Sequence, residues 1–263
     1  MTPDLQQQVT EAMQSLGVTY LYPHQRLVIA NTLEAAFPDE ERVQHRNLVH
    51  VLPTGSGKSL CFVVPSLILD GLSVLVFPLL SLMEDQRRRL EDMQVPARVL
   101  RGGLEAADRE SALEMLRADE ARGVITNPET LQARAVRQEL KQIGVAHLVI
   151  DEAHCITQWG ESFRPAYLNL GNVRAELEPG LTSAFTATAS ASVLQGIATH
   201  LFDGEPHYVL DTAPDRPNIY YRVCESPGPR ASVLHLLSPP NLPPTSSATR
   251  SSSPERDALP PLA

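Results

Sequence analysis

Five short apolar runs, separated by stretches with helical periodicity, dominate the first 225 residues of this 263-residue chain. The runs are continuous rather than alternating, which is typical of strands buried on both faces of a parallel sheet. Helices then connect successive strands and cover both faces. The sequence therefore predicts an α/β fold whose ligands bind beyond the carboxyl ends of the strands. The expected strands span 47–51, 73–77, 123–126, 146–150 and 181–186, and the expected helices include 23–36 and 80–93.

The composition changes near residue 226. Residues 226–263 contain 9 prolines and 8 serines but no aromatic residue. Such a segment buries too little apolar surface to offset its conformational entropy. We therefore expect a domain over residues 1–225 and a disordered C-terminal tail over 226–263. A cloning or frameshift remnant explains the tail equally well.

Charge, hydropathy and cysteine content limit the partners and the cell compartment that we expect for the chain. The net charge of −9 argues against a non-specific DNA coat, although it leaves room for a local basic groove. No apolar run reaches the ~18 residues of a transmembrane helix, so no membrane partner is expected. Cys61, Cys155 and Cys224 are too widely spaced for a disulfide framework or a zinc site. These features indicate an intracellular protein, of the cytoplasm or nucleoid in a bacterium and of the nucleus in a eukaryote.

The first expected strand runs into the sequence PTGSGKS at 53–59, and a helical pattern follows. Glycines let such a loop turn tightly and direct backbone N–H groups at phosphate oxygens. Lys58 is placed to reach the β- and γ-phosphates, and the Ser59 hydroxyl can ligate Mg²⁺. The strict phosphate-loop pattern has glycine where this chain has Leu52. A Gly–Ser turn with an incidental lysine is the alternative, which the flanking strand and helix disfavour. The other residues expected to bind the phosphates of the nucleotide are Thr54, Gly55, Ser56 and Gly57.

The fourth expected strand ends in Asp151, Glu152, Ala153 and His154. Two carboxylates at the carboxyl end of a strand suit a Mg-ATP site. Asp151 can hold Mg²⁺, and Glu152 can orient and deprotonate the attacking water. His154 can hydrogen-bond to neighbouring motifs. Taken alone, this pair could equally be a solvated strand end, but a phosphate loop in the same chain favours catalysis.

The segment from Asp151 to Tyr167 closely resembles the acidic motif and aromatic-rich loop of RecQ helicases, a superfamily-two family. Other blocks resemble the motifs of that family in the same order. They are 52–61, 78–86, 127–131, 186–189 and 215–219. The resemblance spans roughly residues 5–225 and implies the N-terminal RecA-like P-loop lobe of such a helicase.

The resemblance implies ATP and Mg²⁺ as cofactors, without zinc. It assigns catalytic roles to Lys58, Asp151, Glu152 and His154, and it makes Gln25 the reader of adenine. A carboxamide can both donate to and accept from the adenine edge. Tyr22 stands where the family usually has arginine, so Tyr20 or Tyr22 is the candidate for stacking on adenine.

The resemblance also implies contacts with single-stranded or 3′-tailed DNA. Aromatic rings stack on bases and arginine binds phosphate, which suits a loop that couples DNA contact to hydrolysis. A purely structural tryptophan is the alternative for Trp159. The residues assigned to DNA contact or coupling are Trp159, Phe163, Arg164, Pro128, Glu129, Thr186 and Thr188.

The function implied is that of the first motor lobe of a 3′–5′ DNA helicase acting in recombination or repair. Because a RecQ motor has two RecA-like lobes, the chain looks truncated, and a separately encoded second lobe is a candidate partner. Unwinding by this chain alone is not expected. An ATP-dependent DNA-binding switch without unwinding is the second interpretation, and the oligomeric state is left open. A small P-loop kinase would share the phosphate loop but not the aromatic-rich loop.

Overall fold

The computed structural model describes residues 1–37, 45–158, 164–187, 190–212 and 228. The chain clusters into two units, 1–215 and 216–263, and Gly228 is the one described residue of the second. The expected domain end at residue 225 lies outside the described residues, as does the expected disordered tail apart from Gly228. In the described ranges, no helix is both long enough and apolar enough to cross a membrane.

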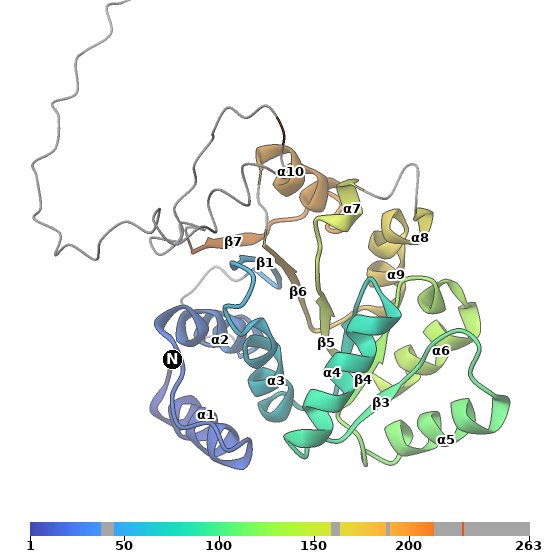
Figure 1. Cartoon of the computed structure of the whole chain (residues 1–263), viewed down its shortest axis with the longest axis horizontal. Helices are drawn as coiled ribbons and strands as arrows, with labels where there is room; N and C mark the ends of the chain where they lie inside the picture. The colour runs from blue at the N-terminus through green and yellow to red at the C-terminus, as the bar shows by residue number, and fades with distance from the viewer. Residues whose placement is uncertain (38–44, 159–163, 188–189, 213–227, 229–263) are drawn as a thin grey trace, which may run out of the picture. The chain divides into compact units, whose positions relative to one another are not determined.

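A parallel sheet forms the centre of the first unit (Figure 1). In the described ranges it has seven strands in the order β3-β4-β2-β5-β6-β1-β7. Every strand pairing in the described ranges is parallel, which confirms the sheet type expected from the continuous apolar runs. The strands are β1 (Asn47–Val51), β2 (Leu72–Val76), β3 (Ala97–Val99), β4 (Gly123–Thr126), β5 (Val145–Ile150), β6 (Leu181–Thr186) and β7 (Tyr208–Asp211).

Helices cover both faces of this sheet, as expected. One apolar cluster joins the sheet to α2 (Pro23–Ala36), α3 (Lys58–Ile68) and α4 (Leu80–Asp92). A second cluster joins the other face to α5 (Ala106–Arg117), α6 (Arg134–Ile143), α9 (Leu170–Leu177) and α10 (Ala191–His200). Helix α1 (Pro3–Ser15) packs on α2 and α3 in a third cluster. Three short helical segments complete the described part: η1 (Thr130–Gln132), α7 (Cys155–Gln158) and α8 (Pro165–Leu168).

Successive strand residues alternate between these two layers. On β2, Val74 and Val76 belong to one apolar cluster and Leu75 belongs to the other. All three side chains are almost fully buried. A strand buried on both faces must be apolar at every position, which explains the continuous runs in the sequence.

Buried polar residues of the sheet, His50, His147 and Ser183, interrupt the apolar layer between the sheet and α3. His50 lies beside Phe185 in the register of β1 and β6, with 4.8 Å between the ring centroids. On β5, His147 Nε2 lies 2.8 Å from Ser183 Oγ of β6. Neither ring nitrogen of His50 has a hydrogen-bond partner among the described residues. Burial lowers the pKa of each of these histidines to about 3, so both are neutral at pH 7.

Candidate nucleotide-binding site

The phosphate loop connects β1 to α3 at the carboxyl edge of the sheet. Gly55 and Gly57 have φ values of 81° and 73°, in the left-handed region that glycine adopts without steric cost. Gly57 caps α3, and Lys58 is the first residue of that helix. The two glycines therefore form the turn that brings Lys58 and Ser59 to the start of the helix.

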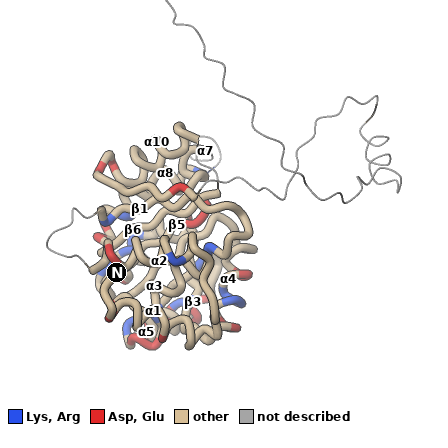
Figure 2. The backbone as a smooth tube through the Cα atoms, turned by 90° about the vertical axis from the view of Figure 1, so that its left-hand side faces the viewer, with Lys and Arg blue, Asp and Glu red and all other residues tan. Residues whose placement is uncertain are grey.

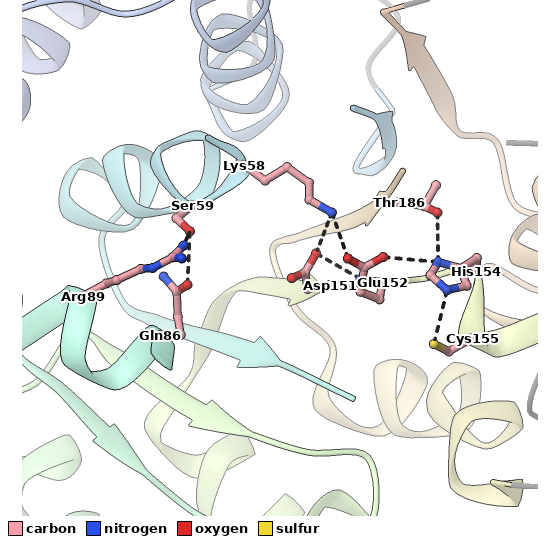
Figure 3. Close-up of polar contacts among 9 residues, drawn as sticks. All are labelled: Lys58, Ser59, Gln86, Arg89, Asp151, Glu152, His154, Cys155 and Thr186. Carbon is pink, nitrogen blue, oxygen red and sulfur yellow. Dashed lines mark hydrogen bonds and ion pairs between the residues drawn. The ribbon is translucent and has the colours of Figure 1, made fainter. Parts of the chain in front are cut away.

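The acidic pair follows β5 and faces Lys58. Lys58 Nζ lies 3.1 Å from Glu152 Oε1 and 3.6 Å from Asp151 Oδ1 (Figure 3). Neighbouring residues of a regular strand would point to opposite faces. Here the strand has ended, and Glu152 has a φ of 49°, a left-handed conformation that costs a non-glycine residue about 1–3 kcal/mol. This turn directs both carboxylates toward one ammonium group.

His154 extends the network toward β6, which lies between β1 and β5. Its Nδ1 is 3.3 Å from Glu152 Oε2 and 3.3 Å from the hydroxyl of Thr186, the last residue of β6. Its Nε2 lies 3.7 Å from Cys155 Sγ. The contacts with Cys155 and Glu152 raise the pKa of His154 to about 9.

The two carboxylates respond differently to their surroundings. Contacts with His154 and then with Lys58 hold the pKa of Glu152 at about 2. Burial raises the pKa of Asp151 above its usual value, and the charge of Lys58 opposes this effect. Glu152 is therefore an ionised carboxylate held between Lys58 and His154.

Ser59 has two partners on α4, and the sequence assigned a role to neither, although Gln86 ends the 78–86 block. Its Oγ lies 3.1 Å from Gln86 Oε1 and 3.5 Å from Arg89 Nη1 (Figure 3). Gln86 shares the buried face of α4 with Met83 and Leu90. In the sequence, the one sign of this contact is that the polar Gln86 falls on the apolar face of a predicted helix.

Gln25 supports the phosphate loop from α2. The side chain is buried, and its Nε2 donates to the carbonyl oxygens of Ser56 at 3.1 Å and Gly57 at 3.2 Å. Its Oε1 accepts from the backbone N–H of Tyr22 at 2.9 Å. A Cβ atom on Gly57 would lie only 2.4 Å from Gln25 Nε2. Gln25 is thus tightly packed against the loop, and adenine reading by this residue stays a prediction.

Aromatic side chains lie beside the same loop. The rings of Tyr22 and His24 stack at 5.7 Å with an interplanar angle of 5°, and Tyr20 meets Tyr22 edge-on at 5.6 Å. His24 Nε2 lies 2.8 Å from the carbonyl oxygen of Ser56. Tyr20 and Tyr22 are both more than half exposed. The exposed rings therefore offer a stacking surface at the edge of the phosphate loop.

Arg164 joins two of the expected DNA-contact segments. Its guanidinium donates to the carbonyl oxygen of Pro78, and its Nε lies 3.7 Å from Glu129 Oε1. Gln132 connects the same segments, because its Nε2 donates to the carbonyl oxygen of Pro128 at 2.9 Å and to that of Ala166 at 3.4 Å. The structure thus brings Pro128, Glu129 and Arg164 together, whereas Trp159, Phe163 and Thr188 lie outside the described residues.

The donor groups at this site suit Mg²⁺ bound together with a nucleotide. No set of three or more His, Cys, Asp or Glu side chains that could hold a metal occurs in the described ranges. Mg²⁺ needs no such set, because it keeps several waters and binds through one or two protein oxygens and substrate phosphates. The Ser59 hydroxyl and the Asp151 carboxylate are oxygen donors of this kind.

Residues 22–196 match the family described as DEAD/DEAH box helicase. The chain belongs to this helicase family. It is 38% identical over 185 residues to the probable ATP-dependent DNA helicase RecS of Bacillus subtilis, which covers 70% of this chain and 37% of that protein. It is 38% identical over 184 residues to the ATP-dependent DNA helicase RecQ of a Synechocystis strain, covering 68% of this chain and 38% of that one. The resemblance to RecQ helicases is confirmed, and the chain spans well under half the length of either relative.

Solved helicase structures share the fold. DUF1998 helicase MrfA bound to DNA aligns with a TM-score of 0.61 at 20% identity, over 80% of this chain and 30% of that one. A hypothetical ATP-dependent RNA helicase from Sulfolobus tokodaii aligns with a TM-score of 0.54 at 19% identity, over 78% of this chain and 57% of that one. These alignments confirm the RecA-like α/β architecture of this helicase-family member.

Proposed function

We propose that this helicase-family chain binds Mg-ATP at the carboxyl edge of its sheet and hydrolyses it. The observation that carries the proposal is the position of Lys58. This lysine begins the helix after a phosphate loop and contacts both carboxylates that follow β5. A cation and an acidic pair on separate elements thus meet where ligands of parallel sheets bind.

Each polar group has a role in holding the nucleotide. Lys58 leaves the carboxylates and faces the β- and γ-phosphates, while backbone N–H groups of the 53–59 loop cradle them. Ser59 and Asp151 would hold Mg²⁺, which would neutralise phosphate charge. Gln25 and the exposed Tyr20 and Tyr22 lie on the side of the loop where adenine is proposed to bind.

Glu152 is the proposed base for the attacking water. Its contacts with His154 and with Lys58, the latter at 3.1 Å, hold it ionised, and the loss of the Lys58 contact to bound phosphate makes it more basic. His154 keeps a second contact with Glu152 and reaches Thr186 of β6. We propose that His154 transmits the state of the nucleotide site to neighbouring motifs.

The wider proposal is the first motor lobe of a RecQ-type 3′–5′ DNA helicase that acts in recombination or repair. Support comes from the relatives named ATP-dependent DNA helicases. Single-stranded or 3′-tailed DNA is the proposed partner, contacted by the segments around Pro128, Glu129 and Arg164. Acidic and basic residues are interspersed along α4, next to the same region (Figure 2).

Binding of single-stranded DNA is expected to change the fluorescence of Trp159, which is the only tryptophan of the chain. Stacking of a base on the indole alters its emission, and contacts with phosphates make the affinity fall steeply with salt. The measurement is a titration with an oligonucleotide at 50 mM and 200 mM salt, with a blunt duplex as the control. Emission unchanged by single-stranded DNA at low salt would contradict a role for Trp159 in binding.

A further inference from the structure

The contact between Ser59 and Gln86 bears on how a metal ion is held. Gln86 comes from α4, whereas Ser59 comes from the phosphate loop and α3. Ser59 Oγ donates to Gln86 Oε1 at 3.1 Å, and the Gln86 side chain is only 5% exposed. Solvent therefore has little access to the carboxamide, which lies on the buried face of α4 together with Met83 and Leu90.

A hydroxyl group that gives a lone pair to a cation must direct its hydrogen away from that cation. The hydrogen then needs an acceptor, because an unpartnered buried donor costs about 1–3 kcal/mol. In the structure that acceptor is Gln86 Oε1. Groups that orient a metal ligand in this way contribute substantially to metal affinity without touching the metal.

We propose that Gln86 is a positioning residue for Mg²⁺, acting through the hydroxyl of Ser59. This inference rests on the proposed Mg-ATP site. Gln86 accepts the Ser59 hydrogen and so leaves the lone pairs of Oγ for the cation. Arg89 Nη1, at 3.5 Å, meets the same oxygen in this state, and its exposed side chain is free to turn toward solvent.

The two ends of the carboxamide have different importance. Oε1 has Ser59 as its partner, whereas Nε2 is buried without a hydrogen-bond partner among the described residues. Replacing Nε2 by oxygen keeps the acceptor and removes an unpartnered donor, and the negative charge that it adds lies near the guanidinium of Arg89, whose Nη1 is 3.5 Å from the same Ser59 Oγ. Gln86→Glu is therefore expected to retain the function, whereas Gln86→Met and Gln86→Leu remove the acceptor at similar volume.

The test is the affinity for a fluorescent ATP analogue, measured with Mg²⁺ and with a chelator. The Mg²⁺-dependent gain is the affinity with Mg²⁺ divided by the affinity with the chelator, and its value for the wild-type chain is the reference. We expect this gain to fall about tenfold or more in Gln86→Met and Gln86→Leu, as for other groups that orient metal ligands. Affinity in the chelator is expected to stay unchanged, and Gln86→Glu is expected to keep the full gain.

A double-mutant cycle separates positioning from packing. If Gln86 acts through Ser59, Gln86→Met has no further effect on the Mg²⁺-dependent gain in a Ser59→Ala background. Gln195→Met, an exposed glutamine of α10, is the control for the substitution type. Thermal melting of each variant shows whether the fold is retained.

Two results would overturn the inference. One is that Gln86→Met and Gln86→Leu fold and show the same Mg²⁺-dependent gain as the wild-type chain. The other is an equal loss in Gln86→Met and Gln86→Glu, because both variants then fail through packing rather than through the acceptor. Failure of the proposed function looks different, since the wild-type chain itself would then bind no Mg-nucleotide.

Discussion

The Glu152→Gln variant is expected to bind Mg-ATP as the wild-type chain does and to lose about 10²–10⁴-fold in ATP turnover, the usual contribution of a general base. The substitution keeps the size of the side chain and a hydrogen-bonding oxygen for Lys58. It removes the carboxylate that accepts a proton from water. Because only the transition state uses this basicity, turnover falls without a matching loss of affinity.

The measurement is phosphate release under saturating Mg-ATP, with binding followed separately. Glu178→Gln is a matched control, because Glu178 also has a left-handed φ, 51°, and pairs with Lys141 Nζ at 2.9 Å. It ends α9, away from the phosphate loop. Turnover by Glu152→Gln equal to that of the wild-type chain would show that another group is the base.

Mild acid is expected to destabilise the fold through His50 and His147. An unfolded histidine titrates near pH 6.5, whereas burial lowers the pKa of both native side chains to about 3. Between these values the unfolded chain binds protons that the native chain does not, so stability falls as the pH drops below 6.5. At pH 5 each histidine lowers the free energy of unfolding by about 2 kcal/mol. The total free energy of unfolding of a typical domain is about 5–15 kcal/mol, so this is a large share.

The measurement is the free energy of unfolding by urea at pH 7 and pH 5. His50→Leu removes one of the two titrations and is expected to lose about 2 kcal/mol less than the wild-type chain over this interval. His200→Leu, at an exposed position, is the control. If His50→Leu and the wild-type chain lose the same stability, the acid sensitivity does not come from His50.

The continuous apolar runs were sufficient to predict the central strands, because a strand buried on both faces leaves little choice of residue. Two edge strands were missed. Ala97–Val99 has three partly buried residues, and Tyr208–Asp211 has a single buried residue. Short edge strands need less apolar sequence, so the neighbouring strand determines them more than their own composition does.

At the site, local sequence was sufficient where one segment contains the whole feature. The glycines of the phosphate loop and the acidic pair after β5 are such features. The contact of Ser59 with Gln86 was not predictable, because it depends on how α3 and α4 pack. Nor could the sequence show that Gln25 is packed against Gly57, since their distance depends on how α2 approaches the loop.

The Mg-ATP site itself is tested most directly by calorimetry on the wild-type chain and Lys58→Ala. Lys58 is the cation placed to meet the phosphates, and hydrogen bonds to charged groups contribute about 1.5–3 kcal/mol each. Lys141→Ala is the matched control, because Lys141 forms its ion pair with Glu178 on the surface. We expect the control to bind Mg-ATP as the wild-type chain does and Lys58→Ala to bind at least tenfold more weakly, about 1.4 kcal/mol. Equal affinity of Lys58→Ala and the wild-type chain would contradict the proposed site.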